Sequence, residues 1–192
     1  AFRGLKIADD PSFEEHLNRY NVIFIDCGEM YCNKPEGWTT AQMINYCVVP
    51  EFIRAYPELE FPNECNLAMA ISRVYSDTNE KFVIIMDEYD IVIREQDSAD
   101  LPSYIKLLNG LFKSNSLSNA IALAYITGIL PIIRDSVQSK LNNFKEFTMV
   151  NARRLAPFIG FTREETEYLA EKNGMEMAEL ERWYDGYCIN GI

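Results

Sequence analysis

The sequence is poor in the residues that build zinc sites and histidine-dependent active sites. Its 192 residues include a single histidine, His16, and no Cys-x-x-Cys pair. The five cysteines are Cys27, Cys32, Cys47, Cys65 and Cys188. A Cys/His zinc site is therefore not expected, and His16 stands in Glu-Glu-His-Leu without an evident serine or cysteine partner for a catalytic triad. We interpret the cysteines as reduced thiols of a cytosolic protein, mostly filling the core.

Basic residues are also scarce. Lysine and arginine together number 18 against 29 aspartates and glutamates, which gives a net charge of −11. Non-specific binding to nucleic acid requires basic side chains that displace counterions, so this balance argues against it. It does not argue against a bound nucleotide, because a local Mg²⁺ ion and a few backbone amides can dominate a small site.

No hydrophobic run is long enough to cross a membrane. The longest one, residues 121–133, is interrupted by Thr127, Gly128 and Pro131. The amino-terminal residues do not have the pattern of a signal peptide. We therefore expect a cytoplasmic protein.

What the sequence does contain is an alternation of apolar strands and amphipathic helices. Apolar runs predict strands at residues 21–27, 82–87 and 120–127, with a weaker strand near 147–150. Helices are predicted at about 12–20, 40–56, 67–75 and 101–112, and residues 28–40 are predicted to form a loop. A capping box of Ser12 and Glu15 would open the first helix, and Pro50 would bend or break the second. Apolar strands separated by helices indicate an α/β fold with a mostly parallel sheet, covered by helices on both faces.

The carboxyl-terminal part of the chain changes from strands to a pair of helices. A second capping box, formed by Thr162 and Glu165, predicts a helix start, and Gly174 is a natural helix stop. We therefore predict two domains, an α/β core at residues 1–150 and a helical subdomain at residues 151–192.

Polar residues follow the predicted strands where the strands end. These residues are Asp26, Asp87, Glu88, Thr127 and Gly128. The carboxyl ends of parallel strands meet at one edge of a sheet, and ligands of open α/β sheets bind at that edge. The sequence therefore predicts that these five residues share one edge.

The segment from Phe82 to Asp90 looks like the Walker B segment of an ATP-hydrolysing P-loop protein. It reads Phe-Val-Ile-Ile-Met-Asp-Glu-Tyr-Asp, an apolar strand that runs into an acidic pair. The usual partner of this segment, a G-x-x-x-x-G-K-[ST] loop that holds phosphates, is absent from the 192 residues. The structural alternative is an acidic pair that only caps a buried strand.

Several blocks together resemble the predicted AAA-ATPase-like family, bacterial P-loop NTPases close to the STAND group. The blocks lie at residues 2–7, 10–13, 16–23, 82–90, 125–131, 138–144, 158–162 and 182–187. Members of this family commonly begin with a P-loop segment upstream and often end in a nuclease-like domain of the PD-(D/E)XK type. This sequence contains neither, so we expect it to be a fragment of a longer protein.

The resemblance implies that ATP and Mg²⁺ are ligands of the full-length protein. Asp87 would hold the metal through a bound water, and Glu88 would polarise the water that attacks the γ-phosphate. Thr127 and Gly128 would correspond to the sensor that touches the γ-phosphate or this water, and Arg134 would stabilise charge in the transition state. The alternatives are structural, namely a turn at Thr127 and Gly128 and a solvated Arg134.

Structural roles are expected for the remaining candidates. Asp26 ends a strand at the same edge, and Asp90 is expected to solvate its loop or cap a helix. The aromatic cluster at residues 183–187 is expected to pack between the helix pair and the sheet.

Two functions remain open at this point. The first is the core of an Mg²⁺-dependent ATPase, which without its P-loop would bind ATP weakly and not turn it over. The second is a non-catalytic protein-interaction or scaffolding module derived from an NTPase fold. A Gly-rich loop with Lys and Ser/Thr immediately upstream of Ala1 in the native gene would favour the first.

Overall fold

The computed structural model describes residues 2–130, 144–148 and 151–184. The chain divides into two compact units, residues 1–143 and 144–192. The predicted domain boundary between residues 150 and 151 stays a prediction.

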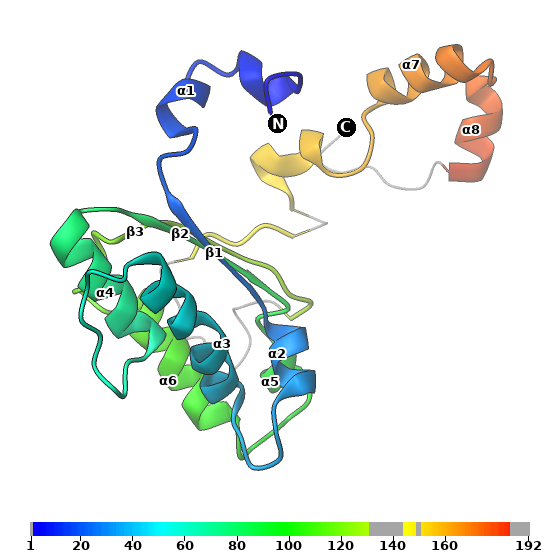
Figure 1. The fold of residues 1–192 in the computed structure, drawn as a ribbon. Helices are drawn as coiled ribbons and strands as arrows, with labels where there is room; N and C mark the ends of the chain where they lie inside the picture. Colours follow the sequence, from blue (N-terminus) through cyan, green and yellow to red (C-terminus); the bar gives the residue numbers. More distant parts are fainter. Residues whose placement is uncertain (1, 131–143, 149–150, 185–192) are drawn as a thin grey trace. The chain divides into compact units, whose positions relative to one another are not determined.

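The first unit alternates helices and strands (Figure 1). Its elements are η1 (Lys6–Asp9), α1 (Phe13–His16), β1 (Asn21–Asp26), α2 (Cys27–Asn33), α3 (Thr40–Ala55), α4 (Leu67–Thr78), β2 (Phe82–Asp87), α5 (Ile91–Arg94), α6 (Leu101–Phe112) and β3 (Ile121–Ile126). The three strands form one sheet in the order β1-β2-β3, and both pairs are parallel. The predicted α/β class and parallel sheet are confirmed.

The register of the sheet aligns the carboxyl ends of the strands. Asp26 at the end of β1 pairs with Asp87 at the end of β2. On the other side of β2, Met86 pairs with Ile126, so that Thr127 follows β3 at the same level as Asp87. Polar residues that are far apart in the sequence therefore meet at one edge.

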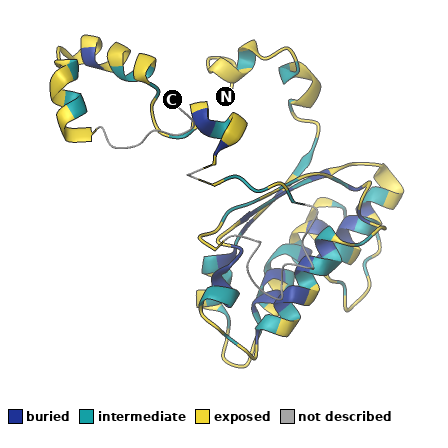
Figure 2. Cartoon of the chain, turned by 180° about the vertical axis from the view of Figure 1, so that it is seen from behind, coloured by how far each residue is buried: buried dark blue, intermediate teal, exposed yellow. Residues whose placement is uncertain are grey.

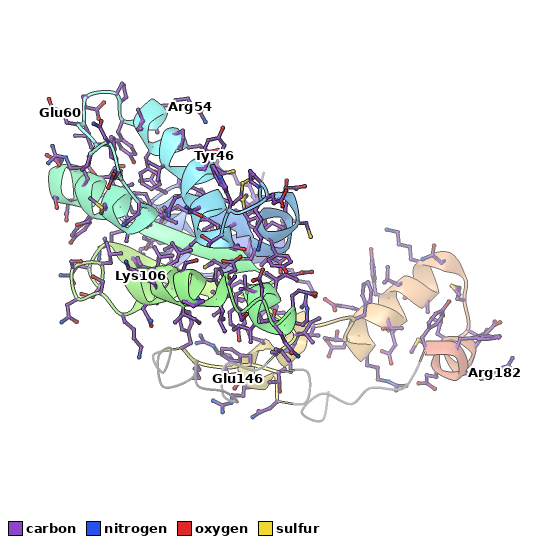
Figure 3. All side chains as sticks on the ribbon, turned by 90° about the horizontal axis from the view of Figure 1, so that it is seen from below. Tyr46, Arg54, Glu60, Lys106, Glu146 and Arg182 are labelled. Carbon is purple, nitrogen blue, oxygen red and sulfur yellow. The ribbon has the colours of Figure 1, made fainter. Side chains whose placement is uncertain are left out.

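Helices α3, α4 and α6 pack on one face of the sheet (Figure 1). The strands direct fully buried side chains such as Ile25, Ile84 and Met86 into this layer. The apolar stripe of α4 is buried as well, through Leu67, Ala70, Ile71 and Val74. Figure 2 shows the buried residues gathered where these helices meet the sheet, and Figure 3 shows charged side chains such as those of Arg54 and Glu60 extending outward. This layer is the core of the first unit.

The opposite face of the sheet carries exposed apolar side chains. Alternate residues of a strand point to opposite faces, and the residues that point away from α3, α4 and α6 are largely accessible. Val22 and Phe24 of β1 are each 61% exposed, while Leu123 and Tyr125 of β3 are 57% and 52% exposed. The helices expected on this second face are not seen among the described residues.

Local structure departs from the sequence prediction at three helices. Helix α2 occupies Cys27–Asn33, where a loop was expected, because Asp26 caps it by accepting a hydrogen bond from Glu29 N at 2.8 Å. Helix α1 is only four residues long, and the Ser12 side chain does not cap it. Helix α3 continues through Pro50 without a break.

The second unit contains η3 (Arg153–Phe158), α7 (Arg163–Asn173) and α8 (Met177–Tyr184). The predicted capping box is present, since Thr162 and Glu165 exchange hydrogen bonds at the start of α7. Gly174 ends α7 with a left-handed φ of 64°, a conformation that glycine adopts without steric cost. The helix pair is therefore confirmed.

The described residues of the second unit contradict two other predictions. In place of a fourth strand, Thr148 forms an isolated antiparallel bridge with Asn151, and residues 149–150 lie outside the described residues. Trp183 and Tyr184 are exposed rather than packed in a core. The rest of that aromatic cluster, residues 185–187, is also outside the described part of the chain.

The described cysteines, Cys27, Cys32, Cys47 and Cys65, are all free thiols. Only Cys27 is buried, so the prediction that they mostly fill the core is wrong. Cys188 lies outside the described residues. Within the described ranges, no helix has both the length and the apolar character that a membrane span needs.

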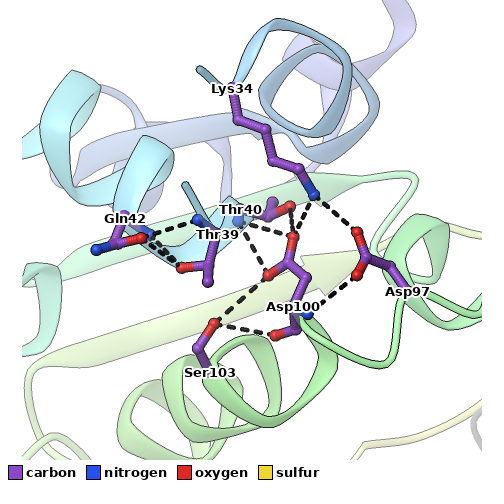
Figure 4. A network of polar contacts seen from close by, with 7 residues as sticks. All are labelled: Lys34, Thr39, Thr40, Gln42, Asp97, Asp100 and Ser103. Carbon is purple, nitrogen blue, oxygen red and sulfur yellow. Dashed lines mark hydrogen bonds and ion pairs between the residues drawn. The ribbon is translucent and has the colours of Figure 1, made fainter. Parts of the chain in front are cut away.

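A network of ion pairs and hydrogen bonds joins two loops of the first unit (Figure 4). The ammonium of Lys34, which follows α2, lies 2.6 Å from Asp100 Oδ2 and 3.1 Å from Asp97 Oδ2. Asp100 is buried and also accepts hydrogen bonds from the backbone N–H and the hydroxyl of Thr40. Because Thr40 begins α3 and Asp100 precedes α6, the network fixes the amino-terminal ends of these two helices to each other.

Candidate functional site

The candidate site lies at the carboxyl edge of the sheet, where β2 and β3 end. The backbone ties the two strand ends together, since Thr127 N donates to Met86 O at 2.9 Å and Tyr89 N donates to Thr127 O at 3.0 Å. The turn that follows β2 and the segment that follows β3 are therefore held side by side. This arrangement places the predicted residues Asp87, Glu88, Thr127 and Gly128 close together.

Asp87 is oriented through one of its two carboxylate oxygens. Oδ1 accepts hydrogen bonds from the Thr127 hydroxyl and from Glu88 N, the latter at 3.0 Å. Among the described residues Oδ2 has no hydrogen-bond partner, and the side chain is exposed. The carboxylate is thus fixed in direction while one oxygen remains available to a ligand.

Glu88 adopts an uncommon backbone conformation. Its φ is +48°, in the left-handed region that residues other than glycine rarely enter and that costs roughly 1–2 kcal/mol. Its carboxylate lies over the start of α2, because a Cβ atom added to Gly28 would be 2.8 Å from Glu88 Oε2. The same oxygen pairs with Arg94 Nη2 at 3.1 Å. Strained residues of this kind concentrate at functional sites.

Asp90 has a different environment from the one the sequence suggested. It is fully buried, and its Oδ2 accepts hydrogen bonds from Ile129 N at 3.2 Å and Leu130 N at 2.8 Å. The prediction that Asp90 solvates a loop or caps a helix is wrong, because its side chain makes no cap hydrogen bond to α5. It instead holds the backbone of Ile129 and Leu130, which follow β3.

The Asp87–Asp90 turn is also supported from below by α6. The hydroxyl of the buried Tyr104 donates to Tyr89 O at 2.8 Å and contacts Cys27 Sγ at 3.3 Å. Burial raises the pKa of the Tyr104 hydroxyl well above its usual value and that of the Cys27 thiol to about 12. Both groups are therefore neutral at physiological pH and support the turn rather than react.

Gly128 approaches its neighbours more closely than any other residue could. A Cβ at this position would lie 2.5 Å from Asp90 Oδ1 and 2.8 Å from the Tyr89 ring. Both neighbours are buried and cannot move aside freely. The predicted contact of Gly128 with a phosphate stays a prediction, but its close packing at the site is a property of the structure.

We expect Gly128→Ala to lower the free energy of unfolding by about 1–3 kcal/mol, the usual cost of overpacking. The added methyl group must displace Asp90 or Tyr89, and urea denaturation measures the loss. Gly110→Ala in α6 is the matched control, because its Cβ would meet only Ala68 at 4.0 Å. The control should stabilise the chain by up to about 1 kcal/mol, as alanine does in a helix. Equal effects at the two positions would contradict the tight packing of Gly128.

The remaining predicted residues are distributed as follows. Asp26 caps α2 through its Oδ1 and so has a structural role. Arg134 lies outside the described residues, and its predicted role remains untested. Arg94 was not predicted, although its position four residues after Asp90 on one helical face is the signal that could have identified it.

The oxygen ligands at this edge fit a metal that arrives with its own ligands. In the part of the chain that the structure describes, no group of three or more acidic, histidine or cysteine side chains could hold an ion by itself. Mg²⁺ usually keeps several waters and is bound by one or two carboxylates plus substrate phosphates. Asp87, with one free oxygen, is suited to that mode.

Comparisons with known proteins find a family that matches most of the chain. A family described as "Predicted AAA-ATPase" matches residues 1–138. An "Uncharacterized protein in vnfD 5'region" of Azotobacter chroococcum mcd 1 is 22% identical over 136 residues, which cover 67% of this chain and 26% of that relative. The chain thus spans about a quarter of the length of the curated relative that it matches. No solved structure shows significant similarity.

Proposed function

Because the chain belongs to the predicted AAA-ATPase family, we propose that Asp87, Glu88 and Thr127 form the metal-binding and water-activating half of an Mg²⁺-dependent ATP-hydrolysing site. The observation that carries the proposal is the carboxylate of Asp87. Thr127 and the backbone of Glu88 occupy its Oδ1, and its Oδ2 has no hydrogen-bond partner among the described residues. One oxygen of this carboxylate is thus held in place, and the other is open to a ligand.

Asp87 would bind Mg²⁺ through a water molecule, and the ion would neutralise charge on the phosphates. Thr127 positions Asp87 in this scheme and would lie near the γ-phosphate at the same edge of the sheet. Phosphoryl transfer needs little covalent help from the protein, so positioning and neutralisation of charge account for most of the catalysis. The carboxylate of Asp87 and the hydroxyl of Thr127, aligned at the ends of adjacent strands, are suited to that task.

Glu88 would accept a hydrogen bond from the attacking water. Its Oε2 is engaged by Arg94, whereas its Oε1 has no hydrogen-bond partner among the described residues. The side chain of Glu88 is half exposed, and its carboxylate lies near Gly28 at the start of α2. Arg134 would complete the site by stabilising transition-state charge, and Gly128 would let a phosphate approach the end of β3.

The phosphate-binding loop would come from outside these 192 residues, which contain no G-x-x-x-x-G-K-[ST] sequence. In this proposal the chain supplies the water-activating half of the site and the rest of a longer protein supplies the phosphate cradle. ATP hydrolysis is therefore proposed for the full-length protein.

The test compares the 192-residue chain with the full-length protein that its gene encodes. We expect the full-length protein to release phosphate from ATP in the presence of Mg²⁺ and to stop when EDTA is added. The chain alone should bind Mg²⁺-ATP weakly and show no turnover. Sustained phosphate release by the chain alone, lost on Glu88→Gln, would contradict the division of the site, and an inactive full-length protein would contradict the proposed function.

A further inference from the structure

Arg94 lies between two carboxylates that belong to different parts of the candidate site. Its Nη2 atom is 3.1 Å from Glu88 Oε2, and its Nη1 atom is 3.6 Å from Asp90 Oδ1. The guanidinium side chain is only 26% exposed, and Asp90 is fully buried. The planar fork of an arginine can engage two carboxylates at once, which the single ammonium of a lysine cannot do in the same geometry.

Asp90 connects Arg94 to the segment after β3. Its Oδ2 holds the backbone amides of Ile129 and Leu130, while its Oδ1 faces Arg94 without a hydrogen bond. Arg94 Nη1 is likewise buried without a hydrogen-bond partner in the described structure. A buried charge with incomplete hydrogen bonding is costly, so both groups depend strongly on the position of the other.

The contacts form a continuous series from Glu88 through Arg94 and Asp90 to the amides of Ile129 and Leu130. We infer that Arg94 is a positioning residue that couples the carboxylate of Glu88 to the segment after β3. When the backbone of Ile129 and Leu130 moves, Asp90 and Arg94 move with it and change the direction of the Glu88 carboxylate. The functional meaning of this coupling rests on the proposed ATPase function, but the coupling itself does not.

The coupling can be measured in the 192-residue chain without nucleotide. Hydrogen exchange at the amides of Ile129 and Leu130 reports whether Asp90 still holds them. We expect Glu88→Gln to speed this exchange by roughly three- to tenfold, within the range of interaction energies between residues of one network. In an Arg94→Gln background the same substitution at Glu88 should have no further effect. Glu95→Gln, an exposed change of equal charge next to Arg94, is the matched control and should leave exchange unchanged.

The coupling is overturned if Glu88→Gln affects these amides no more than Glu95→Gln does, or if its effect is the same with and without Arg94. If Arg94→Gln does not fold because Asp90 loses its only nearby cation among the described residues, Arg94→Lys replaces it as the background. Lysine keeps the positive charge but cannot engage both carboxylates, so the effect of Glu88→Gln must be smaller there than in the wild type. An undiminished effect in Arg94→Lys would also overturn the inference.

Activity of the full-length protein separates this inference from the proposed function. A positioning role predicts that Arg94→Gln lowers kcat by about tenfold or more while KM for ATP changes little, since the interaction acts on the reacting geometry. Arg94→Lys should recover part of kcat. An increase in KM with unchanged kcat would overturn the positioning role, whereas a wild-type protein without turnover would overturn only the proposed function and leave the exchange experiment to decide the coupling.

Discussion

Replacement of Glu88 by glutamine in the full-length protein is expected to lower ATP turnover by about 10²- to 10⁴-fold, the usual contribution of a positioned acid–base group. Glutamine keeps the size of the side chain, but its amide cannot act as a base toward water. Glu88 follows Asp87 directly, and Asp87 is fixed by Thr127. The measurement is steady-state phosphate release at saturating Mg²⁺-ATP.

Nucleotide binding should survive this substitution. Glu88 contacts water rather than phosphate in the proposed site, so the affinity for Mg²⁺-ATP should stay close to that of the wild type. Asp87→Asn is expected to differ, because it removes the carboxylate that faces the metal and should weaken Mg²⁺-dependent binding. Titration with a fluorescent ATP analogue distinguishes the two effects.

Glu95→Gln is the control for the change in charge. Glu95 is exposed and caps the end of α5 through its backbone only. Its replacement should leave turnover unchanged. If Glu88→Gln retained turnover at the level of Glu95→Gln, the acidic pair would be a strand cap, and the alternative of a non-catalytic interaction module would be favoured.

The position of the candidate site was predictable because it follows from sheet geometry. Apolar runs end at Asp26, Asp87 and Thr127, and parallel strands bring their carboxyl ends to one edge. The register then places these residues side by side. No information beyond the order of the strands was needed for this step.

The buried part of the site was not predictable in the same way. Asp90 reads as an ordinary loop aspartate, and its burial depends on the amides of Ile129 and Leu130, about forty residues further along the chain. Such long-range contacts leave no local pattern in the sequence. The left-handed backbone of Glu88 could not be predicted either, because glycine is the usual sign of that conformation and the sequence has a glutamate there.

The two predicted capping boxes, at Ser12 and at Thr162, have different outcomes, and a neighbouring residue explains the one that does not form. Thr162 and Glu165 form the box, since the Thr162 hydroxyl accepts from Glu165 N and the Glu165 carboxylate accepts from Thr162 N. Ser12 has the same spacing to Glu15, but its hydroxyl and its amide both donate to Asp10 Oδ1, at 2.6 Å and 2.8 Å. The neighbouring aspartate satisfies the serine and removes the cap, which leaves α1 at a single turn.

Replacement of Asp100 by alanine is expected to lower the free energy of unfolding by about 3–5 kcal/mol, the usual effect of removing one partner of a buried ion pair. Asp100 is 2% exposed and accepts hydrogen bonds from Lys34 and from the backbone and hydroxyl of Thr40. Its loss leaves the ammonium of Lys34 with Asp97 alone and leaves two donors of Thr40 without an acceptor. Asp100→Asn should cost less, because its amide oxygen can still accept from Thr40.

Unfolding of the Asp100 variants is best measured near pH 7, because Lys34 and Asp97 are both charged there. Burial alone would lower the pKa of Lys34, but its hydrogen bonds to Asp100 and Asp97 outweigh this effect and raise it. The hydrogen bond from Lys34 lowers the pKa of Asp97. The stabilisation by Lys34 is therefore complete below its unfolded pKa of about 10.4, and it is lost as the pH rises through the higher pKa of the folded state. The stabilisation by Asp97 is complete above its unfolded pKa of about 3.9, and it is lost as the pH falls through the lower pKa of the folded state. At pH 7 both groups are ionised, and the full effect is measured.

A single tryptophan can report on the first unit alone. Trp38 directly precedes Thr39, which forms a capping box with Gln42 at the start of α3. Trp38 packs edge-on against Tyr46, with 5.4 Å between ring centroids. The only other tryptophan in the sequence is Trp183 of the second unit, so a Trp183→Phe background assigns the fluorescence change in urea to the first unit.

In that background, Asp77→Ala is the control, because Asp77 pairs with Arg73 at the surface and such pairs contribute only about 0–1 kcal/mol. An Asp100→Ala variant no less stable than Asp77→Ala would show that the network of Lys34, Asp97 and Asp100 does not hold the two helix ends together. A large difference would mean that one buried carboxylate fixes the start of both α3 and α6, the helix that supports the turn carrying Glu88.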